Sequence, residues 1–230
     1  MLDTSSLQTL IQTAKNRHEK YLPSFNELTR SYLGKYRNEV MEFLRKRNKS
    51  HIFIPVLPSK TRRILASFQE SYFSNEDIVK IEQVLEVAQL APIVDKIQEA
   101  FNHYTQKEMK LFNLLSSNML EAIIYGTPIM RVYWAGDKPK LENINIYDVF
   151  LDPDATSNED LNYLVHNIYL SKAQILNYIE LGIFTPENEI QRETDISRLY
   201  KREKLQEVYY KINNQWYLAT LLENNKLRDI

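Results

Sequence analysis

Oxygen-bearing side chains at alternate positions make residues 152–160 the first candidate for metal chemistry. The residues concerned are Asp152, Asp154, Thr156, Asn158 and Asp160. This spacing is that of the first half of a calcium-binding loop, which also requires glycine at its sixth position and a bidentate glutamate at its twelfth. Those two positions hold Ser157 and Tyr163. The calcium-loop interpretation therefore fails at the positions that would close the site.

The same stretch predicts a structural turn formed by Asp152, Pro153 and Asp154. Aspartate oxygens accept hydrogen bonds from nearby backbone N–H groups, and proline presets one backbone dihedral. A nucleotidyltransferase-like pairing of Asp148 with Asp152 or Asp154 remains an alternative, although no glycine–serine loop accompanies it. We interpret this turn as structural and expect no metal ligand in it.

No other pattern of residues predicts catalysis. The histidines are His18, His51, His103 and His166, and no two of them have the i, i+4 spacing of a helical zinc site. The Gly-x-Ser-x-Gly motif of esterases is absent. The chain has only 4 glycines, none of them clustered as a phosphate-binding loop requires. The sequence thus predicts a protein that is not an enzyme and binds no cofactor.

Basic residues form two groups on either side of residues 51–57, and they are the candidate contacts to nucleic acid or to a neighbouring subunit. They are Arg45, Lys46, Arg47, Lys49, Lys60, Arg62 and Arg63. Cations at this density neutralise phosphates without reading a base sequence, and such binding weakens with salt. The alternatives are ion pairs with acids of a neighbouring subunit, or simple exposure to water.

Charge is distributed unevenly along a chain of ordinary composition. Residues 1–63 carry 13 Lys/Arg and 5 Asp/Glu, a net charge of +8, whereas residues 64–230 carry 16 and 25, a net charge of −9. Such a chain can bind a polyanion with its basic part and a basic neighbour with its acidic part.

The composition excludes two further kinds of site. With no cysteine, disulfides and thiolate metal sites are excluded. No apolar run approaches the ~18 residues of a membrane span, and we expect no membrane partner.

The elements that would position these residues indicate an α+β fold, with a helix-rich N-terminal arm and long helices packed with a small, mainly antiparallel β region. We expect helices near residues 7–17 and 25–44, the second opened by a capping box of Ser24 and Glu27. Residues 51–56 are a predicted edge strand, and a helix follows from Ser59. The predicted division is a helical arm at residues 1–50 and an α+β domain at residues 51–230.

The second part of the chain changes from helical to β patterns at Gly126. A small strand at residues 78–81 is followed by a helical region from Val84 to Tyr125, divided near His103, with a capping box at Thr105–Glu108. Hairpins are predicted for residues 129–146 and for residues 206–222, the latter through Asn213-Asn214. Further predictions are a strand at 163–170, a helix capped by Ser171, and a helix starting at Thr185-Pro186.

Three stretches between about residues 30 and 180 occur in an informative order. The first is Tyr32-Leu33-Gly34 with Tyr36, and the second is His51-Ile52-Phe53-Ile54-Pro55 followed by a helix. The third is a strand leading into Phe150-Leu151-Asp152-Pro153-Asp154-Ala155, then a second strand and a short helix opened by Ser171. A helix, Gly126 and a strand precede the third stretch.

This order resembles the portal proteins of tailed bacteriophages, especially the large portals of short-tailed phages. The resemblance implies an N-terminal, wing-type fragment of a longer protein, whose stem, clip and tunnel elements would lie beyond Ile230. It implies a structural subunit of a homo-oligomeric, dodecameric ring, through which double-stranded DNA is packaged and ejected. The implied partners are capsid, scaffold and packaging-motor proteins, and the implied location is the virion, or the bacterial host cytoplasm during assembly.

A second hypothesis is a sequence-nonspecific DNA-binding or adaptor module that uses the basic residues between 45 and 63. Sequence-specific reading of bases would require a recognition helix or a zinc module, and neither is recognisable.

Overall fold

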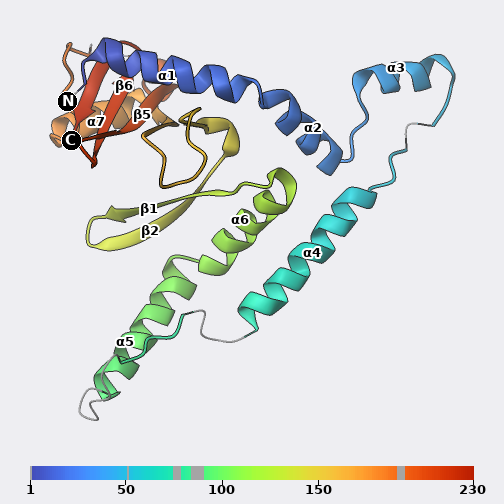
Figure 1. Ribbon diagram of the computed structural model, residues 1–230, viewed down its shortest axis with the longest axis horizontal. Helices are drawn as coiled ribbons and strands as arrows, with labels where there is room; N and C mark the ends of the chain where they lie inside the picture. Colours follow the sequence, from blue (N-terminus) through green and yellow to red (C-terminus); the bar gives the residue numbers. More distant parts are fainter. Residues whose placement is uncertain (1, 51, 75–78, 84–90, 191–194) are drawn as a thin grey trace. The chain divides into compact units, whose positions relative to one another are not determined.

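The computed structural model describes residues 2–50, 52–74, 79–83, 91–190 and 195–230, and it has the predicted α+β fold (Figure 1). The chain divides into two compact units. The sheet unit consists of Met1–Pro23 and Tyr147–Ile230, and the helical unit consists of Ser24–Ile146. The predicted boundary between residues 50 and 51 thus falls inside the helical unit.

Five antiparallel strands form the sheet of the sheet unit in the order β3-β4-β5-β6-β7. They are β3 (Val149–Leu151), β4 (Tyr163–Ser171), β5 (Arg202–Ile212), β6 (Gln215–Leu222) and β7 (Asn225–Asp229). The predicted strand at 163–170 and the hairpin at 206–222 are confirmed. Asn213 and Asn214 both have positive φ, at 49° and 67°, as a tight hairpin turn requires. The sequence patterns did not predict β7.

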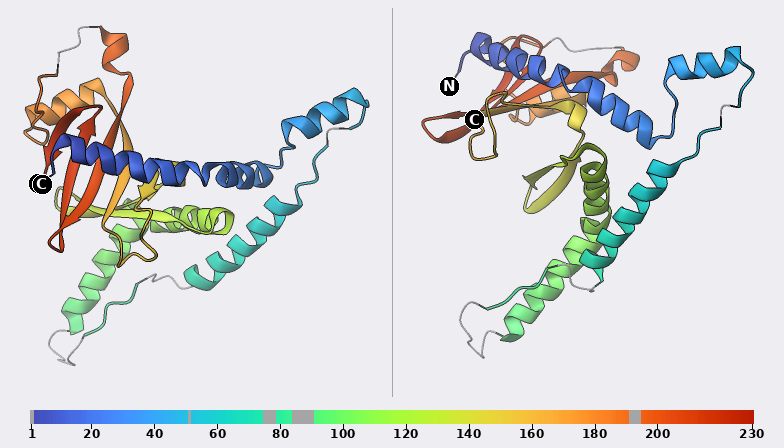
Figure 2. Two further views of the ribbon diagram at one scale, coloured as in Figure 1. Left: turned by 45° about the horizontal axis from the view of Figure 1, so that its top comes forward. Right: turned by 45° about the vertical axis from the view of Figure 1, so that its right-hand side comes forward.

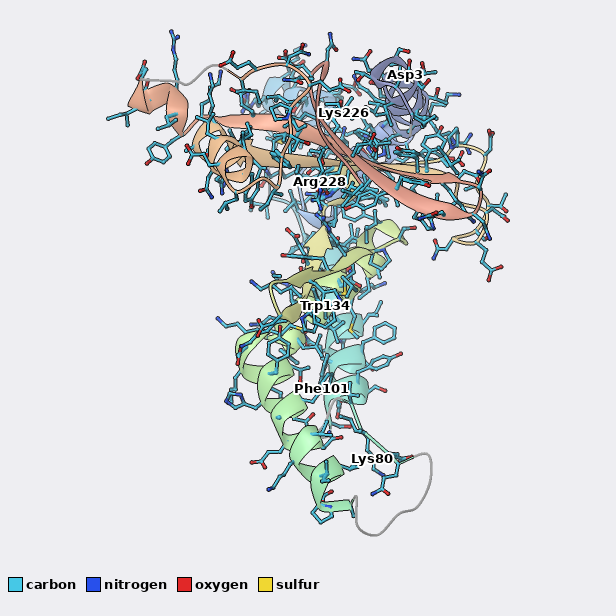
Figure 3. All side chains as sticks on the ribbon, turned by 90° about the vertical axis from the view of Figure 1, so that its left-hand side faces the viewer. Asp3, Lys80, Phe101, Trp134, Lys226 and Arg228 are labelled. Atoms are coloured by element: carbon cyan, nitrogen blue, oxygen red, sulfur yellow. The ribbon has the colours of Figure 1, made fainter. Side chains whose placement is uncertain are left out.

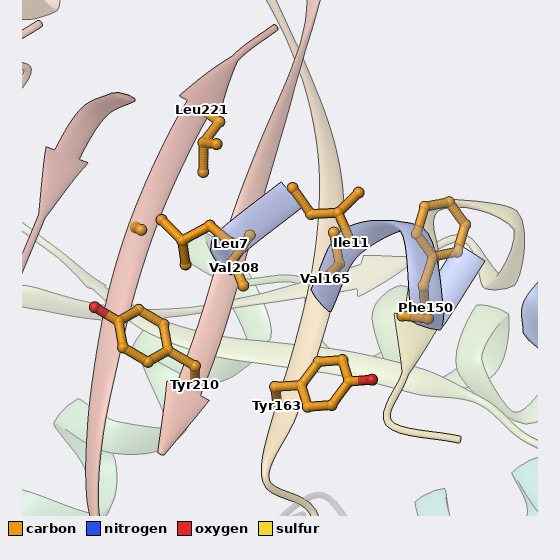
Figure 4. Close-up of a cluster of buried hydrophobic side chains, with 10 residues drawn as sticks. Leu7, Ile11, Phe150, Tyr163, Val165, Val208, Tyr210 and Leu221 are labelled. Carbon is orange, nitrogen blue, oxygen red and sulfur yellow. The ribbon is translucent and has the colours of Figure 1, made fainter. Parts of the chain in front are cut away.

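The N-terminal helix α1 (Thr4–Glu19) covers one face of this sheet, although more than a hundred residues separate them in the chain (Figure 2). The Asp3 side chain caps the helix by accepting a hydrogen bond from the Ser6 N–H at 3.1 Å. The fully buried Leu7 and Ala14 pack on the sheet (Figure 4). Lys226 of β7, labelled in Figure 3, donates to the Leu2 carbonyl oxygen at 3.5 Å and so joins the two ends of the chain.

The helix α7 (Lys172–Glu180) packs on the other face of the sheet. Val208 belongs to the core beneath α1 and Leu205, three residues away on β5, belongs to the core with Ile175 of α7. Because side chains alternate between the faces of a strand, these two positions lie on opposite faces. The predicted cap is confirmed: the Ser171 hydroxyl accepts from the Gln174 N–H at 3.2 Å, and the Gln174 side chain accepts from the Ser171 N–H at 2.9 Å.

The helix predicted to start at Thr185-Pro186 is wrong. The segment runs beside β7 instead, because the N–H groups of Thr185 and Glu187 donate to the Leu227 and Lys226 carbonyl oxygens at 2.6 and 3.0 Å. A short helix, α8 (Ile196–Leu199), follows later in the chain.

The helical unit contains more separate helices than the sequence patterns predict. They are α2 (Leu22–Tyr32, which begins at the unit boundary), α3 (Asn38–Lys46), α4 (Val56–Phe73), α5 (Ala91–His103), the π-helical turn η2 (Tyr104–Glu108) and α6 (Leu111–Tyr125). The single helix predicted over 25–44 is wrong, because Gly34 adopts a positive φ of 67° between α2 and α3. The Ser24 capping box is also wrong, since Ser24 lies inside the first turn of α2.

Two further predictions in the helical unit fail, and others lie outside the described residues. Residues 52–55 form no strand, and α4 begins at Val56. The Thr105 hydroxyl bonds back to the Phe101 carbonyl oxygen at 2.9 Å inside a continuing helix, so it does not cap a new one. Residues 79–81 form no strand, while Ile78 and residues 84–90 are not described.

The second half of the helical unit follows the predicted order. The α-helix α5 ends at His103 as predicted, but η2 continues it to Glu108, and the break before α6 lies at Lys110, whose φ is 54°. Helix α6 ends at Gly126, whose φ is 78°. The hairpin consists of β1 (Ile129–Ala135) and β2 (Lys138–Ile144), and the short 3-10 helix η3 (Ile146–Asp148) follows it. On β2, the Asn143 amide donates to the Leu114 carbonyl oxygen of α6 at 2.7 Å.

Candidate subunit-contact surface

A glycine turn brings residues 33–36 against residues 52–55 in the helical unit. A Cβ at Gly34 would lie 3.1 Å from the Phe53 ring, so both the positive φ and the close approach favour glycine there. The Tyr36 and Phe53 rings meet edge to face with centroids 5.0 Å apart. The Tyr36 hydroxyl donates to the Ile52 carbonyl oxygen at 3.2 Å. These contacts fix the path of residues 52–55 without strand pairing.

Next to this turn lies a hollow of about 620 Å³, which we call the arginine-rimmed pocket. Its lining residues are Tyr32, Leu33, Pro55, Pro58, Ser59, Arg62, Arg63 and Ala66. Leu33 is 54% exposed, so a large apolar side chain at this hollow faces solvent. The pocket therefore combines an apolar floor with two guanidinium groups.

Glu27 forms ion pairs with Arg30 of α2 and with Arg37, the residue that precedes α3. It accepts hydrogen bonds from Arg30 and from Arg37, the latter with Nη2 2.9 Å from Oε1. The hydrogen bonds from Arg30 and Arg37 lower the pKa of Glu27 from 4.5 to about 2. Arg30 and Arg37 are therefore engaged within the unit, in contrast to the basic residues singled out from the sequence.

The seven predicted contact residues are all exposed, in two separate groups. Arg45 and Lys46 lie in the last turn of α3, Arg47 follows with its guanidinium 4.3 Å from the centroid of the Phe43 ring, and Lys49 lies beyond. Lys60, Arg62 and Arg63 lie in the first half of α4. Arg62 and Arg63 both line the arginine-rimmed pocket.

Sequence reasoning missed the exposed apolar side chains of the helical unit. Ile52 and Ile54 are 78% and 74% exposed, and Trp134 on β1, labelled in Figure 3, is 72% exposed. The alternation of Ile52 and Ile54 resembles a half-buried strand, which is why the pattern predicted one. The signal that distinguishes the two cases is Pro55, because a proline cannot donate to a strand ladder.

The corner at Asp152 has the hydrogen bonds of a structural turn. Asp152 is 6% exposed, and its Oδ1 accepts from the Asp154 N–H at 3.1 Å. Its Oδ2 accepts from the N–H and the side-chain amide of Asn162, both at 3.3 Å. Asp154 is exposed, while Pro153 is half-buried. The carboxylate of Asp152 is thus occupied by protein donors on both oxygens.

Two of the histidines are buried in the sheet unit. His18 lies against Phe150 with ring centroids 4.8 Å apart, and burial lowers its pKa. His166 Nδ1 lies 3.4 Å from Glu207 Oε2, and the two residues are paired between strands β4 and β5.

In the described part of the chain, no three His, Asp or Glu side chains are grouped closely enough to hold a metal ion. The same residues include no helix that is both long and apolar enough to span a membrane.

Comparison of the sequence with models of known protein families gave no match, and comparison with curated protein sequences gave none either.

Proposed function

We propose that this chain is a structural subunit of a portal-type ring, a head-to-tail connector through which phage DNA is packaged and ejected. The exposed apolar surface of the helical unit is the observation that carries the proposal. Leu33, Phe43, Ile52 and Ile54 are each more than half exposed within one short part of the chain. Surfaces of this kind are typical of protein interfaces. A ring subunit must offer such surfaces to a neighbour on each side.

The order of elements between Leu111 and Glu180 supports the same proposal. Helix α6 ends at Gly126, the β1–β2 hairpin follows, and β3 leads through the Asp152 corner into β4 and the capped helix α7. This is the order of elements on which the resemblance to portal proteins depends. In this proposal the Asp152 corner positions strands and carries out no chemistry.

The ring proposal also specifies where the other proposed partners would bind. Double-stranded DNA would pass along the ring axis, and capsid, scaffold and packaging-motor proteins would contact the ring's outer surfaces. The proposed location is the virion, and the bacterial host cytoplasm during assembly. Nucleotide hydrolysis would belong to the motor.

The second candidate function is a sequence-nonspecific DNA-binding or adaptor module. It is favoured by the exposure of all seven basic residues between 45 and 63. DNA binding through these residues would be steeply salt-dependent, with a slope of log K against log salt concentration near −0.9 for each phosphate neutralised.

Sedimentation at rising chain concentration, together with a DNA titration over salt, separates the two functions. The ring proposal predicts concentration-dependent assembly into a closed oligomer, with weak and salt-tolerant DNA binding. A monomer that binds DNA with a steep salt slope would support the adaptor instead. A variant with Arg45, Lys46, Arg47 and Lys49 changed to glutamine is the matched control, because it should flatten the salt slope only if these residues contact phosphates.

A further inference from the structure

The arginine-rimmed pocket presents positive charge that the described residues leave unpaired. Arg62 and Arg63 both line it, and both are exposed. Residues 24–63 around it carry ten Lys/Arg against three Asp/Glu. Leu33, Pro55 and Pro58 line the same pocket and add apolar contact area to it. An occupant should therefore combine apolar atoms with at least two carboxylates.

The sheet unit carries a segment with that chemistry. Residues 147–171 contain five Asp/Glu and no Lys or Arg. Asp154, Glu159 and Asp160 are exposed on the loop between β3 and β4, which we call the acidic loop (Asp154–Asp160). Leu151, immediately before the corner, is 46% exposed.

Hydrogen bonds within the acidic loop fix its conformation, so the positions of its charged residues are also fixed. Asp152 anchors both ends through the Asp154 and Asn162 N–H groups. The Thr156 hydroxyl donates to Asp160 Oδ2 at 2.7 Å, and this hydrogen bond, followed by that of Ser157, lowers the pKa of Asp160. A preorganised loop loses less conformational freedom when it docks.

We infer that the arginine-rimmed pocket of one copy receives the acidic loop of a second copy, with Arg62 and Arg63 facing Asp154 and Glu159. This inference rests on the proposed function, since it names the contact between neighbouring subunits. Charge complementarity selects the occupant, because the most basic part of the chain meets its longest stretch without a cation. Pocket and loop are different surfaces, so the contact is head-to-tail and repeats from copy to copy, as a ring requires.

Reciprocal charge reversal tests this contact in the full chain. R62E/R63E and D154K/E159K should each weaken self-association at least about tenfold, because like charges then meet across the interface. Neither Asp154 nor Glu159 uses its side chain in a hydrogen bond within the described residues, so folding should survive. K96E/K107E is the control, since it changes the net charge as much as R62E/R63E does at exposed positions elsewhere in the helical unit.

A mixture of the two reversed variants gives the sharper result. R62E/R63E has a negative pocket and a negative loop, whereas D154K/E159K has a positive pocket and a positive loop. Each variant alone therefore repels its own copies, while the mixture pairs opposite charges at both contacts and should assemble with the two variants alternating. Combining all four substitutions in one chain should restore assembly, because glutamates at the pocket then face lysines on the loop.

The outcomes separate this inference from the ring proposal. If the unmodified chain assembles but both reversed variants assemble as K96E/K107E does, the pocket contact is wrong and the ring proposal stands. If the unmodified chain stays monomeric at every concentration, ring assembly fails and the contact fails with it. Reversed variants that lose assembly alone and do not regain it on mixing would also overturn the contact.

Discussion

The two units of this chain bury their apolar side chains to very different extents. Among the residues that the structure describes, every large side chain that is less than 2% exposed belongs to the sheet unit, and Leu7, Val165 and Tyr210 are examples. Most of the exposed large apolar side chains among the described residues belong to the helical unit, including Ile52 and Trp134. The sheet unit therefore has its own core, whereas the helical unit has apolar surface left for association.

Helix ends show the same contrast. In the sheet unit, Asp3, Ser171 and Asp195 each cap a helix with a side-chain hydrogen bond. In the helical unit, Arg37 and Lys110 occupy cap positions without one. Helices without caps or a packed core gain little stability from their own sequence and depend on contacts with other elements.

Helix–helix contacts inside the helical unit are local. Helices α4 and α6 meet through a hydrogen bond from the Gln69 amide to the Ser116 hydroxyl at 2.9 Å and through the Phe73 and Phe112 rings, 4.8 Å apart. Elsewhere on α4, Ile64 and Phe68 are exposed. Buried apolar side chains therefore stabilise the sheet unit, whereas the helical unit leaves apolar side chains exposed that the proposed ring would cover.

The largest expected effect is the loss of core packing in the sheet unit. Leu7→Ala removes a fully buried side chain between α1 and the sheet. We expect it to lower the free energy of unfolding by about 2–5 kcal/mol. The matched change Ile52→Ala removes an exposed side chain and should alter the free energy of unfolding by less than about 0.5 kcal/mol.

Each unit can be followed by its own tryptophan. Trp216 lies on β6 and Trp134 on β1, so urea unfolding in a W134F background reports on the sheet unit and in a W216F background on the helical unit. If Leu7→Ala and Ile52→Ala lowered the free energy of unfolding by equal amounts, this result would contradict the contrast in burial between the two units.

Removing a cap should have a smaller effect, again confined to the sheet unit. Ser171→Ala deletes one half of the capping box of α7 and should lower the stability seen by Trp216 by about 1 kcal/mol. Ser171→Thr keeps the hydroxyl and serves as its control. A change seen by Trp134 alone would show that the cap does not belong to the sheet unit's cooperative structure.

A substitution before the uncapped helix α6 should increase stability, whereas the substitutions above decrease it. Lys110 precedes it with a φ of 54°, a left-handed conformation that is costly for a residue with a side chain. Lys110→Gly should therefore stabilise the helical unit by up to about 1 kcal/mol in the Trp134 measurement. A loss of stability would mean that the lysine side chain contributes more than the strain costs.

The smallest effect concerns the Glu27 carboxylate. Its pKa is about 2 when Arg30 and Arg37 donate to it, against an ordinary value of 4.5. Because the folded pKa is depressed, the stabilising contact is complete above pH 4.5 and is lost as the pH falls toward 2. Carboxyl NMR titration should give this low midpoint, and Arg30→Gln should raise it more than Arg37→Gln. An unchanged midpoint in both variants would contradict the assignment.

Local signals predicted the elements that are stabilised locally. The Ser171 capping box, the Asn213-Asn214 turn and the Gly126 helix end were all predicted from short patterns, and the structure confirms them. Errors arose where distant contacts decide the outcome. The Gly34 turn depends on Phe53, and the segment after Thr185 follows β7, which no local pattern marks.

The candidate surface was predictable only in part. The sequence identified Arg62 and Arg63 through their charge, and both are exposed. It did not show that they share a pocket with Tyr32 and Leu33, because that pocket depends on the turn at Gly34. Apolar periodicity also cannot distinguish a face buried within a chain from one that another copy would bury.

Hydrogen exchange measured over a range of chain concentrations tests the central contrast most directly. Amides of β5 (Arg202–Ile212) should be protected equally at every concentration, because the sheet unit folds around its own core. Amides of α4 (Val56–Phe73) should gain protection as the concentration rises and neighbouring copies cover the helical unit. Protection of α4 that equals that of β5 and does not change with concentration would contradict the account.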